Sequence, residues 1–126
     1  MNMKIKCGTD IIEISRIKDS IENLGETFKN KIYTDREIVY CESKGKQKYQ
    51  HYAARFAAKE AAFKAISEDF KDKYELSWKD YEVVCDTQGK PHLIIVGINT
   101  ENIENIDISL SHCKEYAVAN VVVLYK

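Results

Sequence analysis

The chain has 126 residues, of which 44% are apolar and 31% are charged, with one proline and five glycines. These values describe one ordinary globular domain, residues 1–126, that is long enough to bury a core without disulfide or metal crosslinks. Nineteen Lys and Arg against 20 Asp and Glu leave a formal net charge of −1, which argues against a nonspecific nucleic-acid binder or a polybasic membrane binder.

The first predicted element is a strand over residues 4–12, whose side chains alternate between two faces. Asp10 lies inside this strand, where aspartate is disfavoured. Residues 13–24 place isoleucines at helical spacing and end at Gly25, which is typical of an amphipathic helix with a glycine C-cap. A short helix is predicted over residues 35–43.

The strongest predicted helix covers residues 49–70, which contain seven alanines and no glycine or proline. Aromatic side chains form one stripe along it and alanines form another, so we expect this helix to be buried. Glu60 and Lys64 lie one turn apart between the two stripes. Arg55 and Lys59 form a second pair with the same spacing on the opposite flank.

Glu60 has two interpretations. A structural ion pair with Lys64 at this spacing stabilises an exposed helix by about 0.2–0.5 kcal/mol. A metal-binding or catalytic carboxylate is the alternative, because a buried charge requires a partner. The same choice applies to Asp10, and two acids in unfavourable positions suggest a functional site more strongly than one.

The C-terminal half is expected to form antiparallel strands over residues 81–85, 92–96, 106–110 and 116–125. Gly89 and Pro91 make a turn credible between the first two strands. We therefore expect an α+β fold, with an antiparallel sheet and helices inserted after the first strand.

A polar corner, residues 111–115, separates the last two strands. Ser111 and His112 are adjacent there, but no third member of a catalytic triad is evident, so a Ser–His nucleophile is only weakly supported. His112 fits a strand-end histidine bonded to the backbone equally well.

Charge is segregated along the chain. Residues 28–64 carry nine Lys and Arg against four Asp and Glu, a balance of +5, whereas residues 65–110 have a balance of −6. The basic stretch indicates either a site for an anionic ligand or a solvated basic face.

The four cysteines are far apart and form no zinc-type Cys/His cluster, so structural zinc is not expected. The longest uncharged runs, residues 91–100 and 116–125, are too short to span a bilayer, and residues 1–8 lack the apolar core of a signal peptide. This pattern predicts a cytosolic protein with reduced thiols and no membrane partner.

Three segments together resemble the signature blocks of the holo-acyl-carrier-protein synthase family, the short bacterial class of the 4'-phosphopantetheinyl transferase superfamily. They are residues 8–17 (GTDIIEISRI), 55–65 (RFAAKEAAFKA) and 108–117 (ISLSHCKEYA). Their order and the chain length match the family, and residues 55–65 are the most specific block.

The resemblance implies transfer of 4'-phosphopantetheine from coenzyme A to a serine of apo-acyl carrier protein, releasing adenosine 3',5'-bisphosphate and supporting fatty acid biosynthesis. It implies Mg²⁺ as the cofactor and Asp10 and Glu60 as its ligands, which suits a hard cation that binds carboxylate and phosphate oxygens. The ion would polarise the β-phosphate of coenzyme A. The serine proton passes either to Glu60 or to water on the metal.

The resemblance also assigns contacts with coenzyme A. Lys64 matches a lysine that contacts the pyrophosphate, and it joins the two acids as a catalytic residue. His112 matches a histidine near the cofactor, in a binding role. The other expected contacts are Lys44 and Lys46 near the 3'-phosphate and the turn residues Gly89, Lys90 and Pro91 at the nucleotide end.

Arg16 matches an arginine that faces the acyl carrier protein, an acidic partner that a basic surface attracts and orients. The family's homotrimer implies active sites at subunit interfaces, with Asp10 and Glu60 of one chain facing basic or loop residues of the next. One departure follows Ala65, where the family usually has a glycine-containing turn and residues 66–70 here predict a continuing acidic helix.

Two other functions are compatible with these residues. A metal-dependent phosphoester hydrolase would also use two acids, a lysine and a histidine, with water as the acceptor. A noncatalytic carrier-protein-binding module would use Arg16 and the basic surface but would need neither Asp10 nor Glu60.

Overall fold

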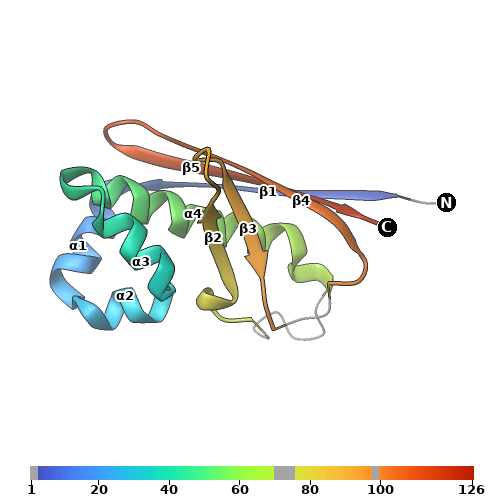
Figure 1. The fold of residues 1–126 in the computed structure, drawn as a ribbon, viewed down its shortest axis with the longest axis horizontal. Helices are drawn as coiled ribbons and strands as arrows, with labels where there is room; N and C mark the ends of the chain where they lie inside the picture. Colours follow the sequence, from blue (N-terminus) through green and yellow to red (C-terminus); the bar gives the residue numbers. More distant parts are fainter. Residues whose placement is uncertain (1–2, 70–75, 98–99) are drawn as a thin grey trace.

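The computed structural model describes residues 3–69, 76–97 and 100–126 (Figure 1). Its helices are α1 (Ile14–Leu24), α2 (Glu26–Ile32), α3 (Asp35–Glu42) and α4 (Lys48–Ile66). Its strands are β1 (Lys4–Glu13), β2 (Tyr81–Cys85), β3 (Pro91–Ile95), β4 (Ile103–His112) and β5 (Tyr116–Tyr125). The predicted α+β fold, with helices inserted after the first strand, is confirmed.

The strands form two antiparallel units. One sheet has the order β1-β5-β4, and β2 and β3 pair as a separate hairpin. Helix α4 packs along β1 and β5, while α1, α2 and α3 gather at one end of the molecule (Figure 1). The core therefore lies on both sides of α4, which joins the sheet to the helical end.

Strand β1 approaches α4 so closely that residue 8 has no room for a side chain. A Cβ atom on Gly8 would overlap the carbonyl oxygen of Ala61 and would lie 3.0 Å from the backbone nitrogen of Ala65. The seven alanines of α4 are each at most 2% exposed. Small residues on both elements thus allow the close approach, which brings Asp10, on the same face of β1 as Gly8, to the side of α4.

The opposite face of the sheet carries exposed apolar side chains. Ile5 and Ile11 of β1 are 69% and 65% exposed, and Val122 of the adjacent β5 is 43% exposed. The register places the polar residues Asp107 and Ser109 of β4 on this same face. The apolar strip on β1 and β5 is therefore typical of a surface that contacts another molecule.

Helix α2 was not predicted from the sequence. It follows α1 immediately, because Gly25 ends α1 with a positive φ of 58° and an N–H bond of 2.8 Å to the carbonyl oxygen of Ile21. Its seven residues bury little beyond Ile32, so they carry no clear helical hydrophobic pattern.

The prediction that α4 continues to Phe70 was wrong within the described residues. The α-helix ends at Ile66, a 3-10 turn covers Ser67–Asp69, and Phe70 lies outside the described residues. The acidic side chains after Ser67 are unfavourable at a helix C-terminus, because the helix dipole is negative there.

Replacing Gly8 with alanine is expected to lower the free energy of unfolding by about 3 kcal/mol, because the added methyl group meets the α4 backbone rather than a flexible side chain. Urea unfolding of Gly8→Ala measures this loss. Glu104→Ala, at an exposed position on β4, is the control and should change stability by less than about 0.5 kcal/mol. Equal stability of the two variants would contradict the close approach.

Candidate functional site

The first group of candidate residues lies where β1 passes α4. The Nζ atom of Lys64 is 3.1 Å from Oδ1 of Asp10 and donates a hydrogen bond of 2.9 Å to the carbonyl oxygen of Thr9. Glu60 is partly buried one turn before Lys64, and its carboxylate has no hydrogen bond or ion pair within the part of the chain that is described. Lys64 thus pairs with Asp10, and the first interpretation of Glu60, a structural ion pair with Lys64, does not hold.

The electrostatics of this group favour binding of a cation. Burial raises the pKa of Glu60, the negative charge of Asp10 raises it further, and Lys64 partly opposes both effects. A metal ion held by the two carboxylates would remove their mutual repulsion. Residues 3–69, 76–97 and 100–126 contain no cluster of three or more His, Cys, Asp and Glu that would form an all-protein metal site. Asp10 and Glu60 therefore fit a hard cation that completes its shell with phosphate and water oxygens.

A pocket of about 310 Å³ opens beside Glu60. The other residues that line it are Lys59, Phe63, Leu76, Ser77, Trp78 and Tyr81. The mixture of apolar side chains with the ionisable side chains of Lys59 and Glu60 suits a ligand that has both apolar and charged parts.

A second group lies near the N-terminal half of α4. We call it the cationic cluster, and it consists of Tyr40, Lys44, His51, Arg55 and His112. The Nζ atom of Lys44 and Cζ of Arg55 lie 4.6 Å and 4.1 Å from the centre of the Tyr40 ring. The His51 ring centre is 5.6 Å from that of Tyr40 and 5.7 Å from that of His112. Residues from α3, α4 and β4 thus meet at one place.

Arg55 is buried and has no counterion among the residues that the structure describes. Its side chain is part of a residue that is 2% exposed, and no carboxylate within the described ranges pairs with it. The Nη1 and Nη2 atoms donate to the carbonyl oxygen of His51 and to Sγ of Cys85, each at 3.5 Å, and Nε has no hydrogen-bond partner in the described structure. A buried cation with an unsatisfied N–H indicates that this cluster binds an anion.

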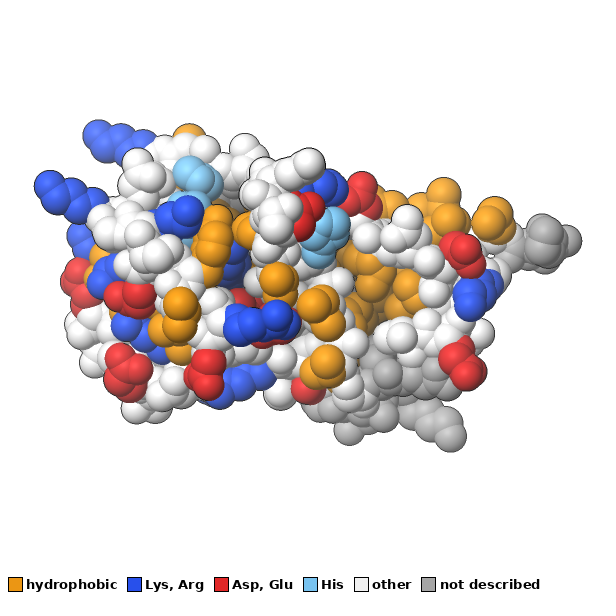
Figure 2. All heavy atoms as spheres, viewed as in Figure 1, with side chains coloured by type: hydrophobic (Ala, Val, Ile, Leu, Met, Phe, Trp, Pro, Cys, Tyr) orange, Lys and Arg blue, Asp and Glu red, His pale blue; other side chains and the backbone are white. Residues whose placement is uncertain are grey.

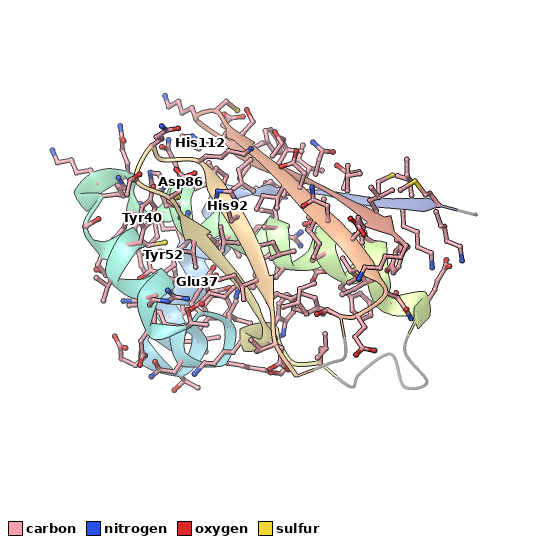
Figure 3. The ribbon with its side chains drawn as sticks, turned by 45° about the vertical axis from the view of Figure 1, so that its right-hand side comes forward. Glu37, Tyr40, Tyr52, Asp86, His92 and His112 are labelled. Atoms are coloured by element: carbon pink, nitrogen blue, oxygen red, sulfur yellow. The ribbon has the colours of Figure 1, made fainter. Side chains whose placement is uncertain are left out.

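The turn between β2 and β3 lies at the same end of the molecule as the cationic cluster. Asp86 accepts the backbone N–H of Lys90 at 3.0 Å, and Gly89 supplies a positive φ of 83°. Figure 3 shows Asp86 and His112 at this end, and Cys85, the last residue of β2, contacts Arg55. Pro91 begins β3. The predicted turn residues are therefore near the cluster, although the Lys90 amine lies 3.5 Å from the carboxylate of Asp107.

The two groups lie on opposite faces of α4. Arg55 and Glu60 are separated by about 140° around the helix axis, and His51 and Glu60 by about 180° and about 13 Å along it. Asp10 reaches Glu60 from β1, whereas Cys85 reaches Arg55 from β2. We call Asp10 and Glu60 together the carboxylate group. One chain therefore presents the carboxylate group and the cationic cluster on faces that do not point toward each other.

The remaining predicted contacts are on the surface. Arg16 is exposed on α1 and has no ion pair with any residue that the structure describes, and Lys46 is exposed in the turn after α3. Figure 2 shows Lys and Arg side chains gathered over the end that carries α1, α2 and α3, with acidic side chains among them. This end of the molecule is therefore mixed in charge rather than uniformly basic.

Comparison with known proteins identifies the family. A model of the 4'-phosphopantetheinyl transferase superfamily matches residues 6–121. The holo-[acyl-carrier-protein] synthase of Ruminiclostridium cellulolyticum is 45% identical over 96% of this chain and 92% of that protein, and that of Halothermothrix orenii is 42% identical over 91% and 93%. The chain belongs to the holo-[acyl-carrier-protein] synthase family.

Solved structures of this synthase family have the same fold. The Bacillus anthracis enzyme, in complex with CoA (3',5'-ADP), is 36% identical, has a TM-score of 0.81 and matches 99% of this chain and 100% of that one. The Helicobacter pylori enzyme, in complex with coenzyme A, is 30% identical, has a TM-score of 0.80 and matches 93% and 98%. No helix in the described part of the chain is long and apolar enough to cross a membrane.

Sequence reasoning missed a buried ion pair in this chain. Lys59 of α4 and Glu37 of α3 are each 1% exposed, with 2.8 Å between Nζ and Oε1, and Lys59 also donates to the carbonyl oxygens of Trp78 and Tyr81. Glu37 accepts the backbone N–H of Val83 at 2.9 Å. The pair joins α3, α4 and β2 and so supports the elements that carry the cationic cluster. A lysine among alanines that were themselves expected to be buried was the signal that could have revealed it.

Lys59→Met is expected to lower the free energy of unfolding by about 3–5 kcal/mol, because it leaves the Glu37 carboxylate buried and unpaired. The double variant Lys59→Met/Glu37→Gln should recover part of this loss. Guanidinium unfolding of both single variants and the double variant measures the coupling. Additive losses would show that the two side chains do not interact.

Proposed function

We propose that this chain transfers 4'-phosphopantetheine from coenzyme A to a serine of apo-acyl carrier protein, with Mg²⁺, and releases adenosine 3',5'-bisphosphate. The serine oxygen forms a bond to the β-phosphorus and gives up its proton to Glu60 or to water, and the bond from that phosphorus to the bridging oxygen breaks as the bisphosphate leaves. Family membership supports the reaction type. The observation that carries the assignment to this chain is the Glu60 carboxylate, which is partly buried, lies near Asp10 and has no ion pair among the described residues. The product would serve fatty acid biosynthesis.

The carboxylate group would act on the pyrophosphate. Mg²⁺ would supply Lewis-acid polarisation of the β-phosphate and neutralise charge on the leaving bisphosphate. Asp10 and Glu60 would hold the ion, and Lys64, already 3.1 Å from Asp10, would contact a phosphate oxygen as a point charge. In this proposal the chain contributes mainly position and electrostatic stabilisation, as in other phosphoryl transfers.

The cationic cluster would bind the nucleotide end of coenzyme A. Lys44, Arg55 and His112 offer donors to phosphate, and Arg55 lacks a counterion in the described structure. The turn of Gly89, Lys90 and Pro91 would contact the nucleotide beside them. The basic side chains near Arg16 would face the acidic carrier protein.

We further propose that the active site forms between subunits of a homotrimer. Two observations support this arrangement. The carboxylate group and the cationic cluster lie on opposite faces of α4, so each could complete the site of a neighbouring chain. The exposed apolar strip on β1 and β5 offers a surface for assembly. The described cysteines are free thiols, which supports a cytoplasmic location.

The reaction is tested by incubating the protein with coenzyme A, Mg²⁺ and an apo-acyl carrier protein and weighing the carrier by mass spectrometry. We expect the carrier to gain one phosphopantetheine and the gain to disappear when a chelator removes the metal. Hydrolysis of coenzyme A without a carrier would instead support a phosphoesterase. Carrier binding without any mass gain, under conditions where a known synthase works, would support a noncatalytic module.

Glu60→Gln and Asp10→Asn are each expected to reduce the transfer rate by about 100-fold or more, because several kcal/mol of metal-dependent stabilisation is lost. Glu60→Gln should not lower stability at pH 7. The raised pKa of Glu60 means that the folded state binds the Glu60 proton more tightly than the unfolded state does. At a pH above this pKa, ionised Glu60 therefore opposes folding. Glu68→Gln, at an exposed acid just after α4, is the control and should keep wild-type activity. Near-normal transfer by Glu60→Gln would refute its role as a ligand.

A shared active site predicts complementation between inactive chains. Glu60→Gln lacks the carboxylate group, and the double variant Lys44→Gln/His112→Gln lacks two exposed members of the cationic cluster. In trimers refolded from an equal mixture, about a quarter of the interfaces should combine an intact carboxylate group of one chain with an intact cationic cluster of the next, and these interfaces should recover activity. If the refolded mixture forms trimers but is no more active than its components, the two halves do not come from different chains.

A further inference from the structure

His51 occupies a central position in the cationic cluster. Its partly buried ring lies between Tyr40 of α3 and His112 of β4, with ring centres 5.6 Å and 5.7 Å away. Its backbone carbonyl oxygen accepts the Nη1 hydrogen of Arg55 at 3.5 Å. Figure 3 shows Tyr40 and His112 at the end of the molecule where these elements meet.

The groups that face His51 are cationic or neutral. They are Arg55 on its own helix, Tyr40 and Lys44 on α3 and the turn after it, and His112 on β4. None of the four basic residues in the cluster has an ion pair with any residue that the structure describes. Burial, followed by Arg55, His112 and Lys44, lowers the pKa of His51 to about 4, so its imidazole is neutral at pH 7.

An anion bound in the cluster would raise the pKa of His51, because its negative charge would offset the nearby positive charges. The unsatisfied Nε of buried Arg55 independently indicates that a ligand with acceptor oxygens belongs here. A phosphate group carries up to two negative charges and three acceptor oxygens, enough to offset the nearby cations and to accept a hydrogen bond from an imidazolium. The neutral His51 of the free protein would then gain a proton from solvent.

We propose that His51 is an additional contact for a phosphate group of coenzyme A, and that its imidazole takes up a proton from solvent when the phosphate binds. The inference rests on the proposed function, because it assumes that coenzyme A occupies the cluster. Apart from the new N–H bond of the imidazole, no covalent bond forms or breaks in the protein or the nucleotide when the phosphate binds. Binding of coenzyme A should therefore tighten as the pH falls from about 8 towards about 6.

The test is calorimetric titration with 3',5'-ADP and with coenzyme A, at pH 6, 7 and 8, in buffers with different ionisation enthalpies. The difference in heat between buffers gives the number of protons taken up. His51→Phe keeps an aromatic ring between Tyr40 and His112 but cannot be protonated. We expect it to take up fewer protons than the wild type and to bind about 10-fold more weakly at pH 6, with little change at pH 8.

Other variants separate His51 from other titrating groups. The phosphate of the free nucleotide titrates near pH 6, and this titration is the same in experiments with every variant. His92→Phe, at the histidine 2.9 Å from Asp86, is the matched control and should retain the wild-type proton uptake. His51→Lys, with a permanent charge, should bind tightly at pH 8 and lose most of the pH dependence. His51→Gln provides a second neutral variant if His51→Phe does not fold.

The outcomes are distinguishable. Wild-type proton uptake and an unchanged pH profile in both neutral variants would overturn the role of His51 and leave the transferase proposal intact. Failure of the wild type to bind either nucleotide at any pH would overturn the proposed function itself. Loss of binding that is equal at pH 6 and pH 8 in the neutral variants would show a structural role and refute coupling to a proton.

Discussion

The contact between β1 and α4 determines where the functional groups lie. Gly8 has no room for a Cβ atom, because the backbone of α4 at Ala61 and Ala65 occupies that space. The alanines of α4 allow an equally close approach on the helix side. With the two backbones at this distance, Asp10 is held close enough to Glu60 to raise its pKa. The strand and the helix thus form one side of the candidate active site through packing alone.

The charged residues of α4, a helix that is buried on most sides, have different environments. Lys59 pairs with Glu37 in the interior, Arg55 packs on Tyr40 with no counterion in the described part of the chain, and Lys64 reaches Asp10 at the edge of the sheet. Glu60 has no ion pair or hydrogen bond with any residue that the structure describes. The satisfied pair of Lys59 and Glu37 supports the fold, whereas the unsatisfied groups indicate where ligands bind. The distribution of partners therefore separates structural charges from candidate functional ones.

Much of the fold and half of the candidate site could be predicted from local pattern. Alternation located β1, and helical spacing showed that the helix with Glu60 is buried. The burial of Arg55 and the position of His51 could not be predicted, because their neighbours come from α3, β2 and β4, which are distant in sequence. The i,i+4 spacing of Arg55 and Lys59 also resembles an exposed pair, although both side chains are buried.

The opposite placement of the two groups on α4 is the basis of the proposed shared active site. A crystal structure of the protein with coenzyme A and Mg²⁺ tests it most directly. We predict that the pyrophosphate and metal contact Asp10, Glu60 and Lys64 of one protomer, while the nucleotide phosphate contacts Arg55 and His112 of its neighbour. A single protomer that supplies all of these contacts, or a nucleotide bound away from both groups, would contradict the account.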